Sequence, residues 1–370
     1  MNCPKCDQQN PDNAPLCSSC GYVLSWDPAE LTAARARLSK PLRLAVVSLV
    51  LGILSIPTWA ITAILAIVLG IVSLVKIEKG GGRLTGKGYA AIGIAIPAIL
   101  CSLAGVFALT AKVRYTYRRL VCATHLRSTG VSILIYMNDW DDGYPLAGSS
   151  TTKWGLTPNW QAKDRSAAFG LEIDGEGGQA SVSASVFMMC RSYLMGGLTD
   201  FVCPDDSGTT PFNPSLYAAT PYDWGEFWDF GPDPSKHLSY TYHMPYGPYP
   251  LTKSCPPAMP VMADKNPWLD AFGYTARTKR DFDYFDPTGH AKEVGRGNAI
   301  PHRSRGQNVL FVDVHVTFEK SSACGLNGDN IYTSWSGPDI KKGSIPTLKS
   351  QPADPNDSLL VHDPPAGDFK

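Results

Sequence analysis

Two uncharged stretches decide the fold: residues 44–75, LAVVSLVLGILSIPTWAITAILAIVLGIVSLV, and residues 88–111, GYAAIGIAIPAILCSLAGVFALTA. The first is 32 residues long and the second is 24. A bilayer core about 30 Å thick is crossed by about 20 helical residues, so each stretch is long enough to span it. Buried helices of soluble proteins seldom run this far without a charge. The first stretch begins too late for a cleaved signal peptide. The sequence therefore predicts a membrane protein.

The first stretch allows two interpretations, because Pro57 lies near its middle. Proline removes a helical hydrogen bond and disfavours helix at the preceding residue. The stretch is then either one long kinked span or a tight hairpin whose arms have about 13 to 16 residues each, short for a bilayer. Small residues interleave with the apolar ones at Ser48, Gly52 and Gly70, as in closely packed membrane helices.

Residues 1–25 form a short head with two Cys-x-x-Cys knuckles. Their cysteines are Cys3, Cys6, Cys17 and Cys20, and this spacing predicts four thiolates around one tetrahedral Zn²⁺. Two disulfides are the alternative. A segment this short buries no core, so the metal would supply most of its folding free energy. Because all four ligands come from the protein, the site is expected to be structural.

The head is similar to the small bacterial zinc ribbons found at the N-termini of membrane proteins. Residues 26–42 follow it as a linker, and residues 43–112 form the transmembrane helical domain. A basic, glycine-rich loop, Lys76–Lys87, separates the two apolar stretches. Ribbon, apolar block, basic loop and second apolar block together resemble a small bacterial membrane domain of unknown function.

Beyond Lys112 the chain predicts a helix that leaves the membrane and ends at Asp141-Asp-Gly-Tyr-Pro145. Apolar residues recur along it at helical spacing and give one stripe: Tyr117, Leu120, Val121, Thr124, Val131, Leu134 and Ile135. The segment from Cys122 to Pro145 resembles bacterial pilin-like proteins of the type II secretion pseudopilin class. That resemblance implies one helix that runs from the membrane into a globular head.

Further segments share the resemblance, in order, over residues 113–335: Phe201-Val-Cys-Pro-Asp205, Leu238-Ser-Tyr-Thr-Tyr242, Met262-Ala-Asp-Lys-Asn-Pro267 and His302 through Asp313. Two features depart from the family. No leader cut before Phe, with Glu five residues in, precedes the helix, so prepilin processing and filament assembly are in doubt. Val314 stands where the family has glycine, and a β-branched residue resists the positive φ of a tight hairpin turn. We therefore expect Val309–Phe318 to run on as one strand.

The expected fold class is a multidomain membrane protein: a zinc ribbon, transmembrane α-helices, and an α+β pilin-like head over residues 113–340. In the head the long helix packs on a small antiparallel sheet with long irregular loops. Expected elements are strands at 239–243, 259–263 and 201–203 and a helix near 184–194. The aromatic residues between them are expected to fill the core rather than bind carbohydrate or peptide. Residues 341–370, rich in Pro, Asp, Gly and Ser, read as a disordered tail.

Common catalytic motifs are absent: no Gly-x-Ser-x-Gly, His-Glu-x-x-His, Walker A loop or kinase signature occurs. The sharpest candidate is a metal held by His302, Asp313 and His315, since two histidines and a carboxylate can bind non-haem iron. We prefer the interpretation that these three are polar residues at strand edges and in turns, with no catalytic role. Pseudopilin heads often hold Ca²⁺, and Asp264, Asp313 and Asp329 are candidates that match no loop motif, so calcium stays unassigned.

Lys plus Arg and Asp plus Glu number 33 each, and a net charge of zero argues against a general nucleic-acid surface. The expected partners are the lipid bilayer and other proteins or further copies of the chain, with no small-molecule substrate identified. The first hypothesis is a non-catalytic, membrane-anchored pilin-like structural or assembly protein. The others are a zinc-ribbon scaffold that recruits partners and a metal-dependent membrane enzyme.

Basic residues flank the apolar stretches on every side, so the positive-inside rule cannot orient the chain. Ribbon thiolates need a reducing compartment, which predicts a cytoplasmic ribbon in a bacterial inner membrane. The pilin-like resemblance predicts an extracytoplasmic head, where some of five cysteines could pair. Opposite sides require an odd number of crossings. We therefore expect a multi-pass protein with three crossings, two of them in residues 44–75.

Overall fold

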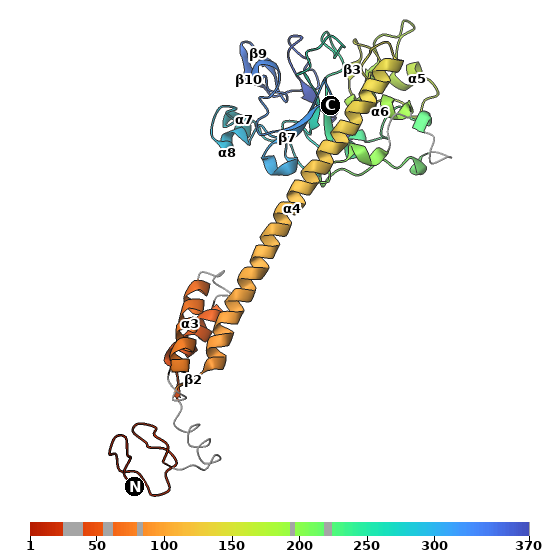
Figure 1. Ribbon diagram of the computed structural model, residues 1–370. Coiled ribbons are helices and arrows are strands. Elements are labelled where there is room, and N and C mark those ends of the chain that lie inside the picture. Colours follow the sequence, from red (N-terminus) through yellow and green to blue (C-terminus); the bar gives the residue numbers. More distant parts are fainter. Residues whose placement is uncertain (25–39, 55–61, 80–83, 193–196, 218–223, 370) are drawn as a thin grey trace. The chain divides into compact units, whose positions relative to one another are not determined.

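The computed structural model describes residues 1–24, 40–54, 62–79, 84–192, 197–217 and 224–369 (Figure 1). These divide into two compact units, Met1–Val113 and Arg114–Lys370, and helix α4 contributes residues to both. Each unit is described by itself below.

The first unit contains α2 (Arg43–Leu54), α3 (Ala63–Lys79) and the start of α4 (Lys87–Asp139). Small residues make their contacts close. The hydroxyl of Ser48 donates to the carbonyl of Ala66 at 2.9 Å, joining α2 to α3. A Cβ at Gly52 would lie 2.9 Å from the carbonyl oxygen of Gly93, so α2 and α4 approach at their backbones. The predicted role of small residues in helix packing is confirmed. A two-residue parallel pair, β1 (Lys40–Pro41) with β2 (Leu84–Thr85), precedes α2 and α4.

Within the described residues, α4 alone is long and apolar enough to cross a membrane. The 12 residues of α2 and the 17 of α3 extend about 18 and 26 Å at 1.5 Å per residue, less than a 30 Å core. Pro57, where the hairpin was expected to turn, lies outside the described residues. The coarser prediction of a membrane helix agrees with α4, whereas the three-pass topology stays a prediction.

Helix α4 has 53 residues and is continuous from the second apolar stretch to Asp139. The prediction that the second apolar stretch continues into the stem helix is therefore confirmed. Many apolar side chains of its first half are exposed, among them Ile99, Leu103 and Phe107. This exposure is expected of a surface that contacts lipid rather than protein.

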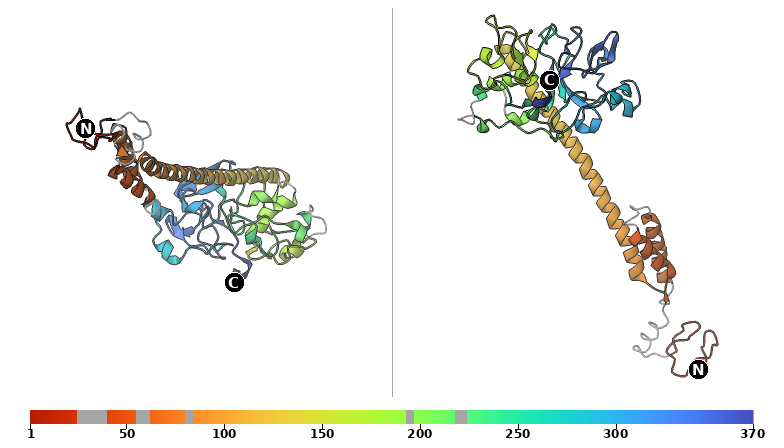
Figure 2. Two further views of the ribbon diagram at one scale, coloured as in Figure 1. Left: turned by 90° about the horizontal axis from the view of Figure 1, so that it is seen from below. Right: turned by 180° about the vertical axis from the view of Figure 1, so that it is seen from behind.

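The second half of α4, which we call the stem (residues 114–139), lies along one side of the head (Figure 2). The side chains that face the head are buried: Cys122, Leu126, Thr129, Ile133, Tyr136 and Met137. The predicted apolar stripe lies on the opposite face of the helix, and six of its seven residues are exposed. The stem therefore has two apolar faces, and the head covers only one of them.

The head is built on a five-stranded antiparallel sheet in the order β11-β5-β6-β7-β8. Its strands are β5 (Tyr240–His243), β6 (Pro260–Asp264), β7 (Gln307–Phe311), β8 (Val316–Glu319) and β11 (Leu360–Val361). The stem packs closely against it at Gly130, where an added Cβ would lie 2.8 Å from Leu310 Cδ1. A long helix on a small antiparallel sheet was predicted, and these elements agree with that outline.

The expectation of one strand over Val309–Phe318 is wrong. Strands β7 and β8 pair as a hairpin, and Val314 adopts a φ of 66° in its turn. The backbone N–H of Val314 donates to the carbonyl of Phe311 at 2.9 Å, and the carboxylate of Asp313 accepts from the backbone of His315. A Cβ on Gly130 would lie 2.9 Å from Val314 Cγ1. Packing against the stem therefore outweighs the backbone strain that valine incurs at positive φ.

The remaining elements of the head are short. The helices are α5 (Arg165–Phe169), α6 (Val182–Arg191), α7 (Lys279–Asp283) and α8 (Ala291–Val294), and the minor strands are β3 (Lys153–Trp154), β4 (Gln179–Ala180), β9 (Ser334–Ser336) and β10 (Asp339–Ser344). The short strand expected at 201–203 is wrong: a 3₁₀ turn, Leu198–Phe201, precedes Cys203 there. The expectation that aromatic residues fill the core is confirmed, since Phe227, Trp228, Phe230 and Tyr246 are buried.

The prediction that residues 341–370 are disordered is also wrong. Leu359, Leu360 and Val361 are fully buried, and β11 pairs with β5 at the edge of the sheet. The carboxylate of Asp363 accepts hydrogen bonds from the backbone of Val182 and Ser183 at the start of α6. The composition of this segment suggested disorder, but its short apolar run, residues 359–361, is ordered because it pairs with β5 at the edge of the sheet.

Candidate metal centres

The four ribbon cysteines converge as predicted, with all four sulfur atoms within 4.8 Å of one another. Cys3 Sγ lies 3.5 Å from Cys20 Sγ, and Cys6 Sγ lies 3.6 Å from Cys17 Sγ. A tetrahedron with Zn–S bonds of about 2.3 Å has edges of about 3.8 Å, so these separations suit a Zn(Cys)₄ site. The group can hold a metal ion, and its identity as zinc is a proposal.

Local backbone geometry shapes each knuckle. Gly21 has a φ of 70° and donates its N–H to the carbonyl of Cys17 at 2.9 Å. Backbone N–H groups of Cys20 and Ser19 point at the sulfur of Cys17 and lower the pKa of this thiol to about 6. A thiol with a lowered pKa is ready to bind metal near neutral pH. The glycine after the second knuckle was therefore an informative signal in the sequence.

The structure reveals a second cluster that the sequence interpretation missed: Cys122, Cys203, Asp264 and His302, which we call the inner centre. All four are buried, and their ligand atoms also lie within 4.8 Å of one another. They come from the stem, the segment after the 3₁₀ turn, the end of β6 and the turn before β7.

Direct contacts join the members of the inner centre. The thiol of Cys122 donates to Asp264 Oδ1 at 2.9 Å, and His302 Nε2 lies 3.5 Å from Cys203 Sγ and 3.4 Å from Asp264 Oδ2. Burial acts to lower the pKa of His302, but the negative charge of Asp264 outweighs it and raises that pKa to about 11. The position of His302 beside Asp264 therefore favours the protonated imidazole.

A second layer of contacts orients these side chains. Asp205 Oδ2 lies 3.0 Å from His302 Nδ1, which leaves Nε2 pointing at the two thiols and Asp264. Arg118 of the stem pairs with the other oxygen of Asp205 at 3.1 Å. The backbone N–H of Asn308 donates to Asp264 Oδ2 at 2.7 Å. His302 and Asp264 are thus each held by a partner outside the centre.

The predicted His302, Asp313 and His315 site does not form. In the described part of the chain, neither group of ligating side chains contains Asp313 or His315. These two residues pair with each other in the β7–β8 turn, where both are about half exposed, whereas His302 is buried in the inner centre. The alternation that put Asp313 and His315 on one face assumed a continuous strand, and the turn removes that basis.

The three aspartates considered for calcium also go to different places. Asp264 belongs to the inner centre, Asp313 lies in the exposed turn, and Asp329 is buried. Asp329 accepts hydrogen bonds from the indole of Trp335 at 2.6 Å and the backbone of Ser358 at 2.8 Å. These contacts hold loops together and give no support to a calcium site shared by the three.

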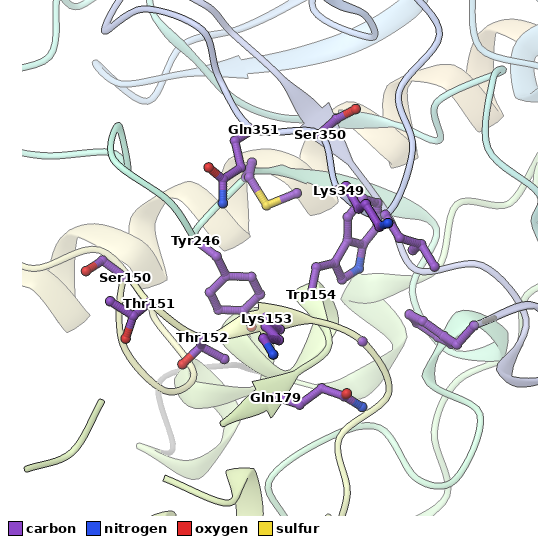
Figure 3. A pocket seen from close by; sticks show the side chains of 14 residues that line it. Ser150, Thr151, Thr152, Lys153, Trp154, Gln179, Tyr246, Lys349, Ser350 and Gln351 are labelled. Atoms are coloured by element: carbon purple, nitrogen blue, oxygen red, sulfur yellow. The ribbon is translucent and has the colours of Figure 1, made fainter. Parts of the chain in front are cut away.

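The head also has a cavity of about 610 Å³ beside β3 (Figure 3). Its wall includes the rings of Trp154 and Tyr246 and the polar side chains of Thr152 and Gln179. The indole of Trp154 is already hydrogen-bonded to Asp363 and the hydroxyl of Tyr246 to the carbonyl of Ser181. The residues that line it include no Asp, Glu, His or Cys.

Comparison with known proteins identifies one part of the chain. A family described as "Domain of unknown function (DUF4190)" matches residues 44–109, which comprise α2, α3 and the first part of α4. No curated protein and no solved structure matches the chain. A domain of unknown function was predicted in this part of the chain and one is present, while its place in a membrane and the pilin-like resemblance of residues 113–340 stay predictions. The chain contains a DUF4190 domain between its four-cysteine head and its stem.

Proposed function

We propose that the protein is a membrane-anchored, pilin-like structural or assembly protein of the type II secretion pseudopilin kind, without catalytic activity of its own. One observation carries the proposal: the apolar helix continues without a break into a stem whose outward face is apolar and exposed. Exposed apolar stripes on soluble surfaces mark protein contacts. Because the stripe continues the membrane helix, its proposed occupant is the stem of another copy, as in assemblies built from pilin-like helices.

The proposed arrangement places the ribbon in the cytoplasm, with Zn²⁺ as its structural metal, and the head outside the bacterial inner membrane. Three crossings are then needed, with two supplied by residues 44–75. Spheroplasts treated with external protease test this. We expect the head to be degraded while an epitope fused to the ribbon survives. Degradation of both, or protection of both, would contradict the three-pass arrangement.

Self-association is tested by placing charges on the exposed stripe. The double variant Leu120→Glu, Val131→Glu should fold, because both side chains are exposed, yet burying two carboxylates between stems is strongly unfavourable. Chemical crosslinking of membranes should give a ladder of oligomers with the unaltered chain. We expect the variant to give at least ten-fold less crosslinked oligomer than the unaltered chain. The stability of its head should be unchanged.

Ile173→Glu is the matched control, since Ile173 is a fully exposed apolar residue of the head that does not belong to the stem. It should leave the ladder intact. An unaltered chain that crosslinks only as a monomer would refute self-association. Crosslinks only to other proteins, lost on deletion of residues 1–24, would favour the zinc-ribbon scaffold instead.

A further inference from the structure

We propose that the inner centre, Cys122, Cys203, Asp264 and His302, is a second structural metal site that binds Zn²⁺ and fastens the stem to the head. It is separate from the ribbon and draws all its ligands from the second unit. The proposal does not depend on whether stems self-associate. Neither the DUF4190 match, which ends at residue 109, nor the predicted His302, Asp313 and His315 site accounts for it.

The donor set points to the metal. Two cysteine sulfurs, one imidazole nitrogen and one carboxylate oxygen match the ligands that proteins use for Zn²⁺. Tetrahedral bonds of about 2.0 to 2.3 Å place ligand atoms about 3.3 to 3.8 Å apart. The separations of His302 Nε2 from Cys203 Sγ (3.5 Å) and from Asp264 Oδ2 (3.4 Å) already fall in this range. With four protein ligands no position remains for substrate, so the site is structural.

The surroundings are also those of a metal site. Ligating histidines usually bond a carboxylate through their other ring nitrogen, which fixes the tautomer. His302 does so with Asp205, and Arg118 from the stem holds that carboxylate. Asp264 is also held in place, because its Oδ2 accepts a hydrogen bond from the backbone N–H of Asn308. Metal binding requires the thiols as thiolates and the imidazole in its neutral form.

The position of the centre gives the metal a mechanical role. Cys122 lies on the buried face of the stem, whereas Asp264 ends β6 and His302 begins the turn into β7. His302, Arg303 and Ser304 all have φ between 56° and 60°, a conformation that is unfavourable for residues with a Cβ. A metal bond at His302 would hold this strained turn. Through its bonds to Cys122 and Asp264, the metal would thereby link the stem to the sheet.

The experiment uses the full-length chain purified in detergent with all four ribbon cysteines changed to Ser, so that only the inner centre can hold metal. Elemental analysis after purification with zinc in the buffer should give about one Zn²⁺ per chain. X-ray absorption at the zinc edge should show two sulfur and two nitrogen or oxygen neighbours. His302→Gln and Cys203→Ser should each lower zinc content at least five-fold, whereas Cys190→Ser, which removes another buried thiol of the head, should not.

Replacement of zinc by Co²⁺ gives a readout that does not rely on the variants folding. The unaltered inner centre should show thiolate-to-cobalt charge-transfer bands and the visible bands of tetrahedral cobalt. Absence of metal together with a Cys122–Cys203 disulfide in the non-reduced mass spectrum would overturn the proposal. So would absence of metal with both thiols free, since the cluster would then be only the His302–Asp264 ion pair and its neighbours.

Discussion

Removal of metal from residues 1–24 is expected to unfold the ribbon completely. The segment has almost no core, since its buried side chains are few: Cys3, Asn10, Leu16 and Cys17. Structural zinc contributes on the order of 10–16 kcal/mol to the folding of such small sites at pH 7. No other interaction within these residues approaches that magnitude. We therefore expect the folded ribbon to exist only with metal bound.

The measurement is thiol alkylation followed by mass spectrometry of the N-terminal peptide. Before chelation, the four ribbon cysteines should react slowly; after chelation, all four should be alkylated rapidly. Cys190, which is buried in α6 and belongs to neither metal group, is the internal control and should not change. Four cysteines that react equally with and without chelator, or that are already joined as disulfides, would contradict a metal-bound ribbon.

The parts of this structure that local sequence could predict are those with a local cause. The Cys-x-x-Cys spacing and Gly21 define the ribbon, and an uncharged run continuing into an amphipathic one defines α4. Strands β5 and β6 lie within one residue of the expected ranges, and each contains a β-branched residue, which favours strand. These signals depend on residues that are neighbours in the chain.

The errors have long-range causes. Val314 takes a positive φ because the stem at Gly130 packs against it, and these residues are far apart in the sequence. The tail folds because β5 leaves an edge for Leu360 and Val361 to pair with. The direction of the stem's apolar stripe was also misleading, since the smaller, mixed face with Cys122 and Thr129 is the one that meets the head.

The inner centre shows the same limit. Cys203, Asp264 and His302 each lie in a separate segment that resembles pilin-like proteins. Nothing in their spacing says that they meet, because they lie on separate elements and the fourth member comes from the stem. A useful signal was present: three separated motifs each offered a metal-ligating residue, Cys203, Asp264 and His302.

Lys265→Met is expected to destabilise the head by about 3–5 kcal/mol, the usual effect of breaking a buried ion pair from one side. Lys265 follows Asp264 in the chain, and its Nζ lies 3.0 Å from Asp206 Oδ2, with both side chains fully buried. The ammonium also donates to the hydroxyl of Thr209 at 2.7 Å. Methionine matches the length of the lysine stem but leaves the carboxylate of Asp206 without its cation. Domains are commonly stable by only about 5–15 kcal/mol, so the loss is large.

Urea unfolding of the detergent-solubilised chain, followed by tryptophan fluorescence, measures this change. The double variant Lys265→Met, Asp206→Asn should recover part of the lost stability, because the uncompensated charge is gone and the amide can still accept from Thr209. Lys253→Met is the matched control: Lys253 pairs with Asp142, but both side chains are more than half exposed, so water screens the pair and stability should barely change. A single variant as stable as the unaltered head would mean that Asp206 takes up a proton at little cost. A double variant less stable than the single one would show instead that the lost hydrogen bonds, not the buried charge, dominate at this position.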